Sequence, residues 1–232
     1  MLVVSTSALS QAPALTYGLV GDLAYRPAEE PLLQNVLDDL NKNELAFVVH
    51  VGDLSSPPYA CTDDLVARRF AQFSASAHPF IYTPGDNEWT DCHEQQGVKG
   101  GNPLERLAHV RKVFFAGEQS LGRRTMPLVH QSESADPVLQ KYRENVRWTA
   151  GGVTFVTLHV TGSNNGLGRA LDGDAEYAER NKGKPRLAAT GLRNRESQQQ
   201  SCDYDLAASQ HLPGTSADGA IARKGPERLH RG

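Results

Sequence analysis

Three Gly-Asp pairs follow short apolar runs in the first 90 residues of this chain of 232 residues, and their aspartates are Asp22, Asp53 and Asp86. Carboxylates that meet at neighbouring strand ends are costly unless they are protonated or neutralised by a cation. Carboxylate oxygens are also the ligands that hard divalent cations prefer. We therefore predict that these three aspartates bind one or two divalent metal ions.

The elements around these pairs explain why they should meet. Residues 15–20, 46–51 and 80–83 are short, apolar and rich in β-formers, as strands buried on both faces should be. Residues 32–40 and 65–73 carry leucines, valines and phenylalanines at helical spacing. This alternation predicts an α/β fold with parallel strands, in which functional groups gather at the carboxyl edge of the sheet.

Further elements follow along the chain. Asn102 before a proline is typical of the start of a third helix. Residues 145–149 and 153–158 flank a Gly-Gly pair and predict an antiparallel hairpin. Residues 182–232 contain no Val, Phe or Trp, so we expect this tail to be largely disordered.

Composition excludes several classes of protein. The chain has 39% hydrophobic residues and a net charge of −3, which argues against a nucleic-acid binder. No apolar run approaches the roughly 20 residues that span a bilayer, so no membrane span is expected. Three cysteines do not make a disulfide scaffold or a four-cysteine zinc site. Residues 1–14 are either a signal-peptide remnant or a disordered leader.

The motifs together resemble those of the calcineurin-like metallophosphoesterases. The resemblance is closest to a bacterial branch whose third motif reads Gly-Asp-Asn-Glu-Trp-Thr-Asp-Cys-His, as residues 85–93 do here. It extends over about residues 15–181. The segments that carry it are 20–22, 51–55, 84–93, 144–148 and 162–168.

This resemblance implies a four-layer metallophosphoesterase sandwich with a mixed β-sheet, which would be incomplete here. The family's last two motifs, a strand-end His and Gly-His-x-His, would lie beyond residue 181, where only His211 and His230 occur. We therefore divide the chain into the leader 1–14, a partial domain over 15–181, and a non-homologous tail over 182–232, which is foreign or frame-shifted.

The family's roles transfer to this chain residue by residue. Asp53 would bridge two metals, Asp22 would bind the first, and Asp86 would bind the second at a position where the family usually has asparagine. The metals would be manganese, iron, zinc or magnesium, and they would activate a water for attack on a small phosphorylated substrate. The implied activity is hydrolysis of a phosphate ester, that is, a phosphatase-type hydrolase.

The chain departs from the family at catalytic positions. Ala24 stands where the first motif usually has histidine, and Tyr25 is adjacent to it. Asn87 stands at the catalytic position where the family has a histidine proton donor, and His93 is our candidate to replace it. His159 at the end of a predicted strand either faces the site or is structural.

These departures leave a second interpretation open. The chain would then be a truncated or inactive phosphoesterase-like protein that acts at most as a metal-binding, phosphate-binding or interaction module. Cys61 and Cys92 would form a disulfide if the chain is secreted or periplasmic, and would be free thiols in the cytoplasm. Arg68 and Arg69 either attract an anionic substrate or lie on the solvated surface, and His50 is expected to be a core histidine.

Overall fold

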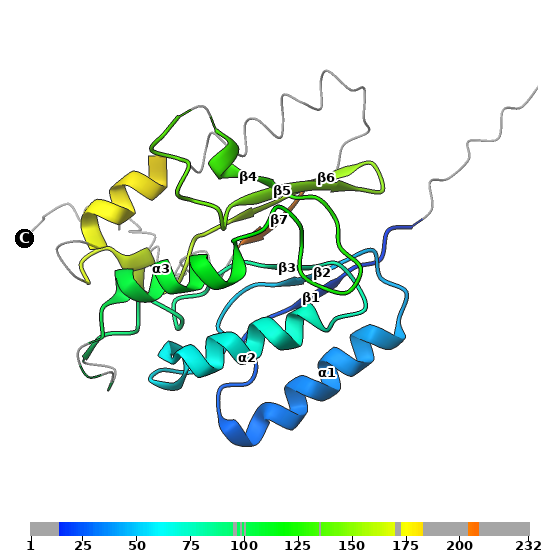
Figure 1. Cartoon of the computed structure of the whole chain (residues 1–232), viewed down its shortest axis with the longest axis horizontal. Helices are drawn as coiled ribbons and strands as arrows, with labels where there is room; N and C mark the ends of the chain where they lie inside the picture. The colour runs from blue at the N-terminus through cyan, green and yellow to red at the C-terminus, as the bar shows by residue number, and fades with distance from the viewer. Residues whose placement is uncertain are drawn as a thin grey trace, which may run out of the picture.

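The computed structural model describes residues 14–94, 97, 99, 101–134, 136–169 and 173–182, together with the backbone of 204–208. The fold is α/β, with two small sheets and four helices in this part of the chain (Figure 1). The helices are α1 (Glu30–Lys42), α2 (Asp63–Ser74), α3 (Pro103–Phe114) and one over 173–182. Short 3₁₀ turns are η1 (Pro27–Glu29), η2 (Tyr59–Cys61), η4 (Gln131–Glu133) and η5 (Ser163–Gly166).

The first sheet confirms the predicted strand–helix–strand pattern. Its strands are β1 (Gly18–Val20), β2 (Val48–His50) and β3 (Phe80–Tyr82). They are parallel and lie in the order β1-β2-β3. Their carboxyl ends therefore share one edge of the sheet, which is where the three Gly-Asp pairs follow.

Side-chain caps fix the starts of two helices, at Asn102 as predicted and also at Thr62. The Thr62 hydroxyl accepts a hydrogen bond from the Leu65 amide (3.2 Å), and the Asn102 side chain accepts one from the Leu104 amide (2.9 Å). Each cap satisfies an amide that has no partner within its helix. Helices α2 and α3 thus begin at positions that the sequence specifies.

A hydrophobic core lies between the first sheet and the helices. Val48, Phe80 and Tyr82 point from the sheet into this core and meet Leu33 and Leu37 of α1. Helices α2 and α3 add buried side chains to the same cluster. Burial of this apolar face is the main contribution that holds the helices on one side of the sheet.

The second sheet contains the predicted hairpin. Strands β5 (Val146–Ala150) and β6 (Val153–Leu158) pair antiparallel, and β4 (Val129–His130) pairs antiparallel with β5. Strand β7 (Tyr204–Ala208) pairs parallel with β6. The sequence predicts no regular structure for the segment that contains β7. The pairing of β7 with β6 is a long-range interaction, and local periodicity does not encode it. Of the predicted tail 182–232, residue 182 ends the helix over 173–182, and the other residues apart from β7 lie outside the described part of the chain. Of the leader 1–14, only residue 14 is described.

The two sheets pack against each other through a second core. Val49 and Ile81, on the face of the first sheet that points away from the helices, join Phe47, Trp148 and Phe155 in one cluster. The Trp148 and Phe155 rings stack at 5.4 Å between centroids. The result is a layer of helices, a parallel sheet and a second sheet (Figure 1). This packing buries the first sheet between the helices and the second sheet.

Candidate functional site

Asp22 and Asp53 end their strands in the same backbone conformation. Both have φ of 56°, in the left-handed region that aspartate tolerates better than most side chains. The Asp22 amide donates a hydrogen bond to the Gly52 carbonyl (3.2 Å), so the two strand ends stay in register. Each strand therefore turns sharply at its carboxyl end and presents an aspartate there.

Glycines let the ends of β2 and β3 approach each other closely. A Cβ on Gly52 would lie 2.1 Å from the Gly85 nitrogen, and Gly52 also has φ of +95°. A Cβ on Gly85 would lie 2.0 Å from Asp53 Oδ1. The Asp53 carboxylate thus lies directly against the backbone of the next Gly-Asp pair, which only glycine permits.

The Tyr25 hydroxyl connects the first two aspartates. It lies 2.7 Å from Asp22 Oδ1 and 3.0 Å from Asp53 Oδ2, so its single proton is shared between them. Asp22 is exposed, whereas Asp53 is only 3% exposed. Burial, together with both carboxylates, raises the pKa of Tyr25, so the hydroxyl stays a donor at physiological pH. The site therefore has Asp22 at its rim and Asp53 at its floor.

Glu88 is a buried acid directly behind Asp53. Its Oε1 accepts hydrogen bonds from the Tyr82 hydroxyl (2.8 Å) and from the Leu54 and Gly85 amides (3.2 and 3.3 Å). Its Oε2 is buried without a hydrogen-bond partner. Burial raises the pKa of Glu88 above its ordinary value, although the three donors oppose this shift.

The third aspartate adds to the negative charge at this position. Asp86 is 8% exposed. Burial raises the pKa of Asp53, and the charges of Glu88 and Asp86 raise it further. The hydrogen-bond donors described for Asp53, the Tyr25 hydroxyl and the Asn87 amide (3.3 Å), are both neutral. Several acids thus share one partly buried space without a described cationic donor to Asp53.

The donor set fits a divalent cation by its charge and chemistry. The oxygens are of the kind that hard cations prefer, and Glu88 Oε2 is a further buried oxygen without a hydrogen-bond partner. In the described part of the chain, however, no three His, Cys, Asp or Glu side chains already form a metal-holding group. The Tyr25 hydroxyl lies between Asp22 and Asp53, so a cation bridging these two would require this hydroxyl to shift.

The two residues expected to act in proton transfer have different positions. Asn87 contributes its backbone amide to Asp53, and its carbonyl oxygen contacts the sulfur of Cys92 at 3.3 Å. His93 lies farther along the loop, where its Nε2 accepts a hydrogen bond from Arg169 (3.1 Å). Arginine only donates, so a neutral His93 carries its proton on Nδ1. A role of His93 in proton donation stays a prediction.

A disulfide joins the loops that follow the second and third Gly-Asp pairs. Cys61 and Cys92 are bonded, with Cα atoms 5.6 Å apart, and both are buried. Of the two states left open by the sequence, the structure therefore has the bridge. Because one cysteine lies in η2 and the other in the loop after Asp86, the bond holds together the two loops that carry Asp53 and Asp86.

Loss of this bond is expected to destabilise the chain. The closed loop has a sequence separation of 31 residues, which predicts about 3.5 kcal/mol of stabilisation from chain entropy. We expect Cys61→Ser with Cys92→Ser to lower the free energy of unfolding by this order in urea titrations. Cys202→Ser, which leaves the bridge intact, is the control. Equal stability of the double variant and the wild type would show that the bridge contributes nothing.

Other residues singled out in the sequence lie in the core. Ala24 is fully buried in the first hydrophobic core. His50 is a core histidine as predicted, with Nδ1 accepting from the Gly52 amide (3.2 Å). Arg69 is fully buried in ion pairing with Glu30, whereas Arg68 is half exposed. Neither alternative proposed for the arginine pair applies to Arg69.

His159 belongs to a buried ionic network. It is fully buried, and its Nδ1 lies 3.0 Å from the Glu144 carboxylate. Its ring packs edge-on against Trp89 at 5.3 Å. Nε2 has no hydrogen-bond partner. The contacts with Glu144 and Trp89 favour the structural alternative for this residue.

Two site residues were missed or left without a role by the sequence interpretation. In the sequence Tyr25 is only the residue next to Ala24, and its placement in the site depends on a contact with Asp53, 28 residues away. Glu88 lies in the third motif, but its role depends on the donors that Tyr82, Leu54 and Gly85 present to it in the fold. No local pattern marks this role, because the neighbouring residues 83–93 are themselves mostly polar.

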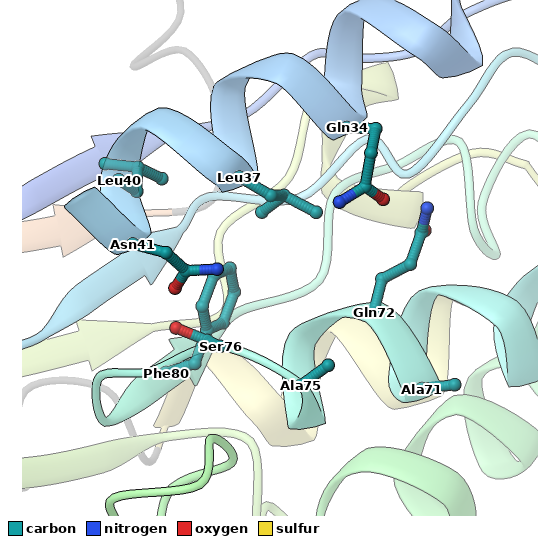
Figure 2. A pocket seen from close by; sticks show the side chains of 9 residues that line it. All are labelled: Gln34, Leu37, Leu40, Asn41, Ala71, Gln72, Ala75, Ser76 and Phe80. Atoms are coloured by element: carbon teal, nitrogen blue, oxygen red, sulfur yellow. The ribbon is translucent and has the colours of Figure 1, made fainter.

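Two concave spaces lie near the helices. A cavity of about 350 Å³ adjoins the third motif and is lined by Trp89, Thr90, Arg169 and the start of α3 at Asn102. A groove of about 280 Å³ lies between α1 and α2, with Leu37 and Phe80 among its lining residues (Figure 2). Its Gln72 already accepts a hydrogen bond from Arg69 (2.9 Å). Only the first of these spaces adjoins a loop that carries a candidate site residue.

Comparisons of the chain with protein-family models, with curated proteins and with solved structures found no match. Within the described residues, no helix combines the length and apolar character that crossing a bilayer requires.

Proposed function

We propose that the chain binds a divalent cation at the carboxyl edge of its first sheet and hydrolyses a phosphate ester there. The observation that carries this proposal is the shared Tyr25 hydroxyl contact of Asp22 and Asp53. Asp53 lies at the same time in the field of Asp86 and Glu88, which helps to raise its pKa. Converging acids of this kind are stabilised by a cation more readily than by each other.

The wider architecture supports the same proposal. A parallel sheet with helices on one face and a second sheet on the other is compatible with part of a metallophosphoesterase sandwich. We infer that the chain is an incomplete form of that fold over about residues 15–181. The first three motifs, with Asp22, Asp53 and Asp86, follow the carboxyl ends of β1, β2 and β3, which is the edge where ligands bind in open α/β proteins.

Asp22, Asp53 and Asp86 are the residues that would hold the metal. A bound divalent cation polarises a phosphoryl oxygen and lowers the pKa of a coordinated water. The Asn87 amide keeps the Asp53 carboxylate oriented, and the Tyr25 hydroxyl remains a donor beside it. His93 is our candidate for protonating the leaving group.

The cavity beside the third motif is the space we assign to the organic part of the substrate. Trp89 and Thr90, which line it, belong to the same turn as Asp86, whose carbonyl accepts from the Trp89 amide (3.1 Å). Arg169 at its wall offers a guanidinium to an anionic substrate. A volume of about 350 Å³ suits a small phosphorylated molecule.

A second candidate function is binding without turnover. It is favoured by the absence of an imidazole at positions 24 and 87, where Ala24 is in the core and Asn87 acts through its backbone. A chain of this kind would hold a metal or a phosphate group but would lack the family's proton donor. The disulfide supports an oxidising compartment, so for either function we propose a secreted or periplasmic location.

The proposal predicts that Asp53→Asn loses at least about 100-fold in Mn²⁺ affinity, because the amide removes the central anionic ligand. Titration calorimetry with Mn²⁺ measures the binding, and release of nitrophenol from an aryl phosphate measures hydrolysis. Because the fold disfavours the ionised Asp53, the metal-free variant should melt no lower than the wild type. Asp39→Asn, on the exposed face of α1, is the matched control.

Three outcomes separate the candidates. Mn²⁺ binding with Asp53-dependent hydrolysis supports the phosphoesterase. Asp53-dependent binding without hydrolysis supports the binding module. Hydrolysis that Asp53→Asn leaves unchanged would contradict the role of this site.

A further inference from the structure

Arg69 is a fully buried arginine that lies behind the candidate metal ligands rather than among them. Its Nη1 and Nη2 bind the two carboxylate oxygens of Glu30 at 2.7 and 2.9 Å. Nη1 also donates to Gln72 (2.9 Å), and Nε donates to the Leu54 carbonyl (3.1 Å). The guanidinium thus connects α1 and α2 to the residue that follows Asp53.

The Leu54 backbone is held from both sides. Its carbonyl accepts from Arg69, and its amide donates to Glu88 (3.2 Å). Asp53 itself has φ of 56°, a conformation that costs energy for a residue other than glycine. Such a backbone persists only where the surroundings over-determine it. The two bonds to Leu54 supply this constraint on the residue next to Asp53.

We propose that Arg69, oriented by Glu30, is a positioning residue that fixes the Asp53–Leu54 backbone and thereby the Asp53 carboxylate for cation binding. The inference rests on the proposed metal function. Lysine cannot replace arginine here, because an ammonium does not present the planar fork that bonds Glu30 on both oxygens while Nε reaches Leu54. The ion pair with Glu30 orients the Arg69 guanidinium. The hydrogen bond from Arg69 Nε to the Leu54 carbonyl then holds the Leu54 backbone in place.

The test compares Arg69→Lys with Arg68→Lys. Arg68 is the neighbouring arginine, is half exposed and reaches Glu30 only at 3.9 Å, so the same substitution there is a matched control. Hydrogen exchange of the Leu54 amide, followed by NMR without metal, reports the held backbone. Titration with Mn²⁺ reports the site. We expect Arg69→Lys to accelerate Leu54 exchange about tenfold and to weaken Mn²⁺ binding about 10- to 100-fold. Arg68→Lys should change both by less than about twofold.

The outcomes are distinguishable from failure of the proposed function. Unchanged Leu54 exchange in Arg69→Lys overturns the inference whether or not the protein binds metal. Faster exchange with unchanged Mn²⁺ affinity also overturns it, because the role would then be structural alone. A wild type that does not bind Mn²⁺ refutes the proposed function, and with it the cation-binding part of this inference. If Arg69→Lys does not fold, Glu30→Gln replaces it, with about threefold changes expected in both measurements because the neutral amide still accepts from Arg69.

Discussion

Replacing Gly85 by alanine is expected to abolish cation binding and to lower the free energy of unfolding by about 3 kcal/mol or more. The new Cβ would lie 2.0 Å from Asp53 Oδ1 and 2.4 Å from the Asp53 nitrogen. The carboxylate could rotate away, but the Asp53 backbone nitrogen could move only if the main chain after β2 moved with it. The ends of β2 and β3 would therefore separate, and Asp53 would leave the position it shares with Tyr25. Urea unfolding and Mn²⁺ titration measure the two effects.

Gly117→Ala is the control for this experiment. A Cβ there would meet its nearest neighbour, the Gln119 nitrogen, only at 3.9 Å. This variant should stay within about 0.5 kcal/mol of the wild type and should keep its cation affinity. Similar behaviour of the two alanine variants would contradict the close approach of the Gly-Asp backbones on which the site is built.

The second large effect is expected at Glu144, which is fully buried just before β5. Its carboxylate pairs with Arg111 of α3 and with His159 after β6. Arg111 also reaches Glu176, which in turn binds the buried Arg180 on the helix over 173–182. This network connects α3, the second sheet and the last described helix.

Glu144→Gln is expected to lower the free energy of unfolding by about 3 to 5 kcal/mol, because it removes the fully buried charge that pairs with Arg111 and leaves Arg111 only its longer contact with Glu176 (3.4 Å). Glu118→Gln is the matched control, since Glu118 pairs with Arg143 at the surface with its side chain 61% exposed. Surface pairs contribute about 0 to 1 kcal/mol. Equal losses of unfolding free energy in the two variants would show that burial does not increase the contribution of the Glu144 network to stability.

Low pH is expected to destabilise the folded chain through the same network. Burial opposes ionisation of Glu144, yet Arg111 and His159 hold its pKa below the ordinary value. Burial, and then Arg180, lower the pKa of His159 to about 4. Both groups bind fewer protons in the folded chain than in the unfolded chain, so stability falls as the pH is lowered. The His159 contribution is lost between about pH 6.5 and 4, whereas the Glu144 contribution begins to fall near pH 4.5 and is lost below pH 4. Glu144→Gln should lack the part of this loss that titration of Glu144 causes.

Much of the first sheet could be predicted from the sequence. Apolar runs and helical stripes report which face of each element is buried, and β1, β2 and β3 with α1 and α2 follow from them. The caps at Thr62 and Asn102 depend on residues adjacent in the chain, so a sequence can indicate them in the same way. The packing of the two sheets is implied only by the family resemblance and does not follow from periodicity, because it depends on contacts between residues such as Phe47 and Trp148 that are far apart in the chain.

Only part of the candidate site could be predicted from the sequence, for the same reason. The Gly-Asp spacing placed Asp22 and Asp53 at one sheet edge, and the structure has both within reach of one hydroxyl. The roles of Tyr25, Glu88 and Arg69 depend on side-chain contacts over 28, 34 and 39 residues, which no local pattern specifies. Metal binding by Asp22, Asp53 and Asp86 stays a prediction.

Anomalous scattering from crystals soaked in Mn²⁺ tests this prediction most directly. Data collected above the manganese absorption edge should show a peak between the carboxylates of Asp22, Asp53 and Asp86, with the Tyr25 hydroxyl shifted from its place between the first two. The peak should be missing in Asp53→Asn crystals soaked in the same way. A wild-type crystal without a peak at this sheet edge, or with manganese bound only elsewhere, would contradict the account.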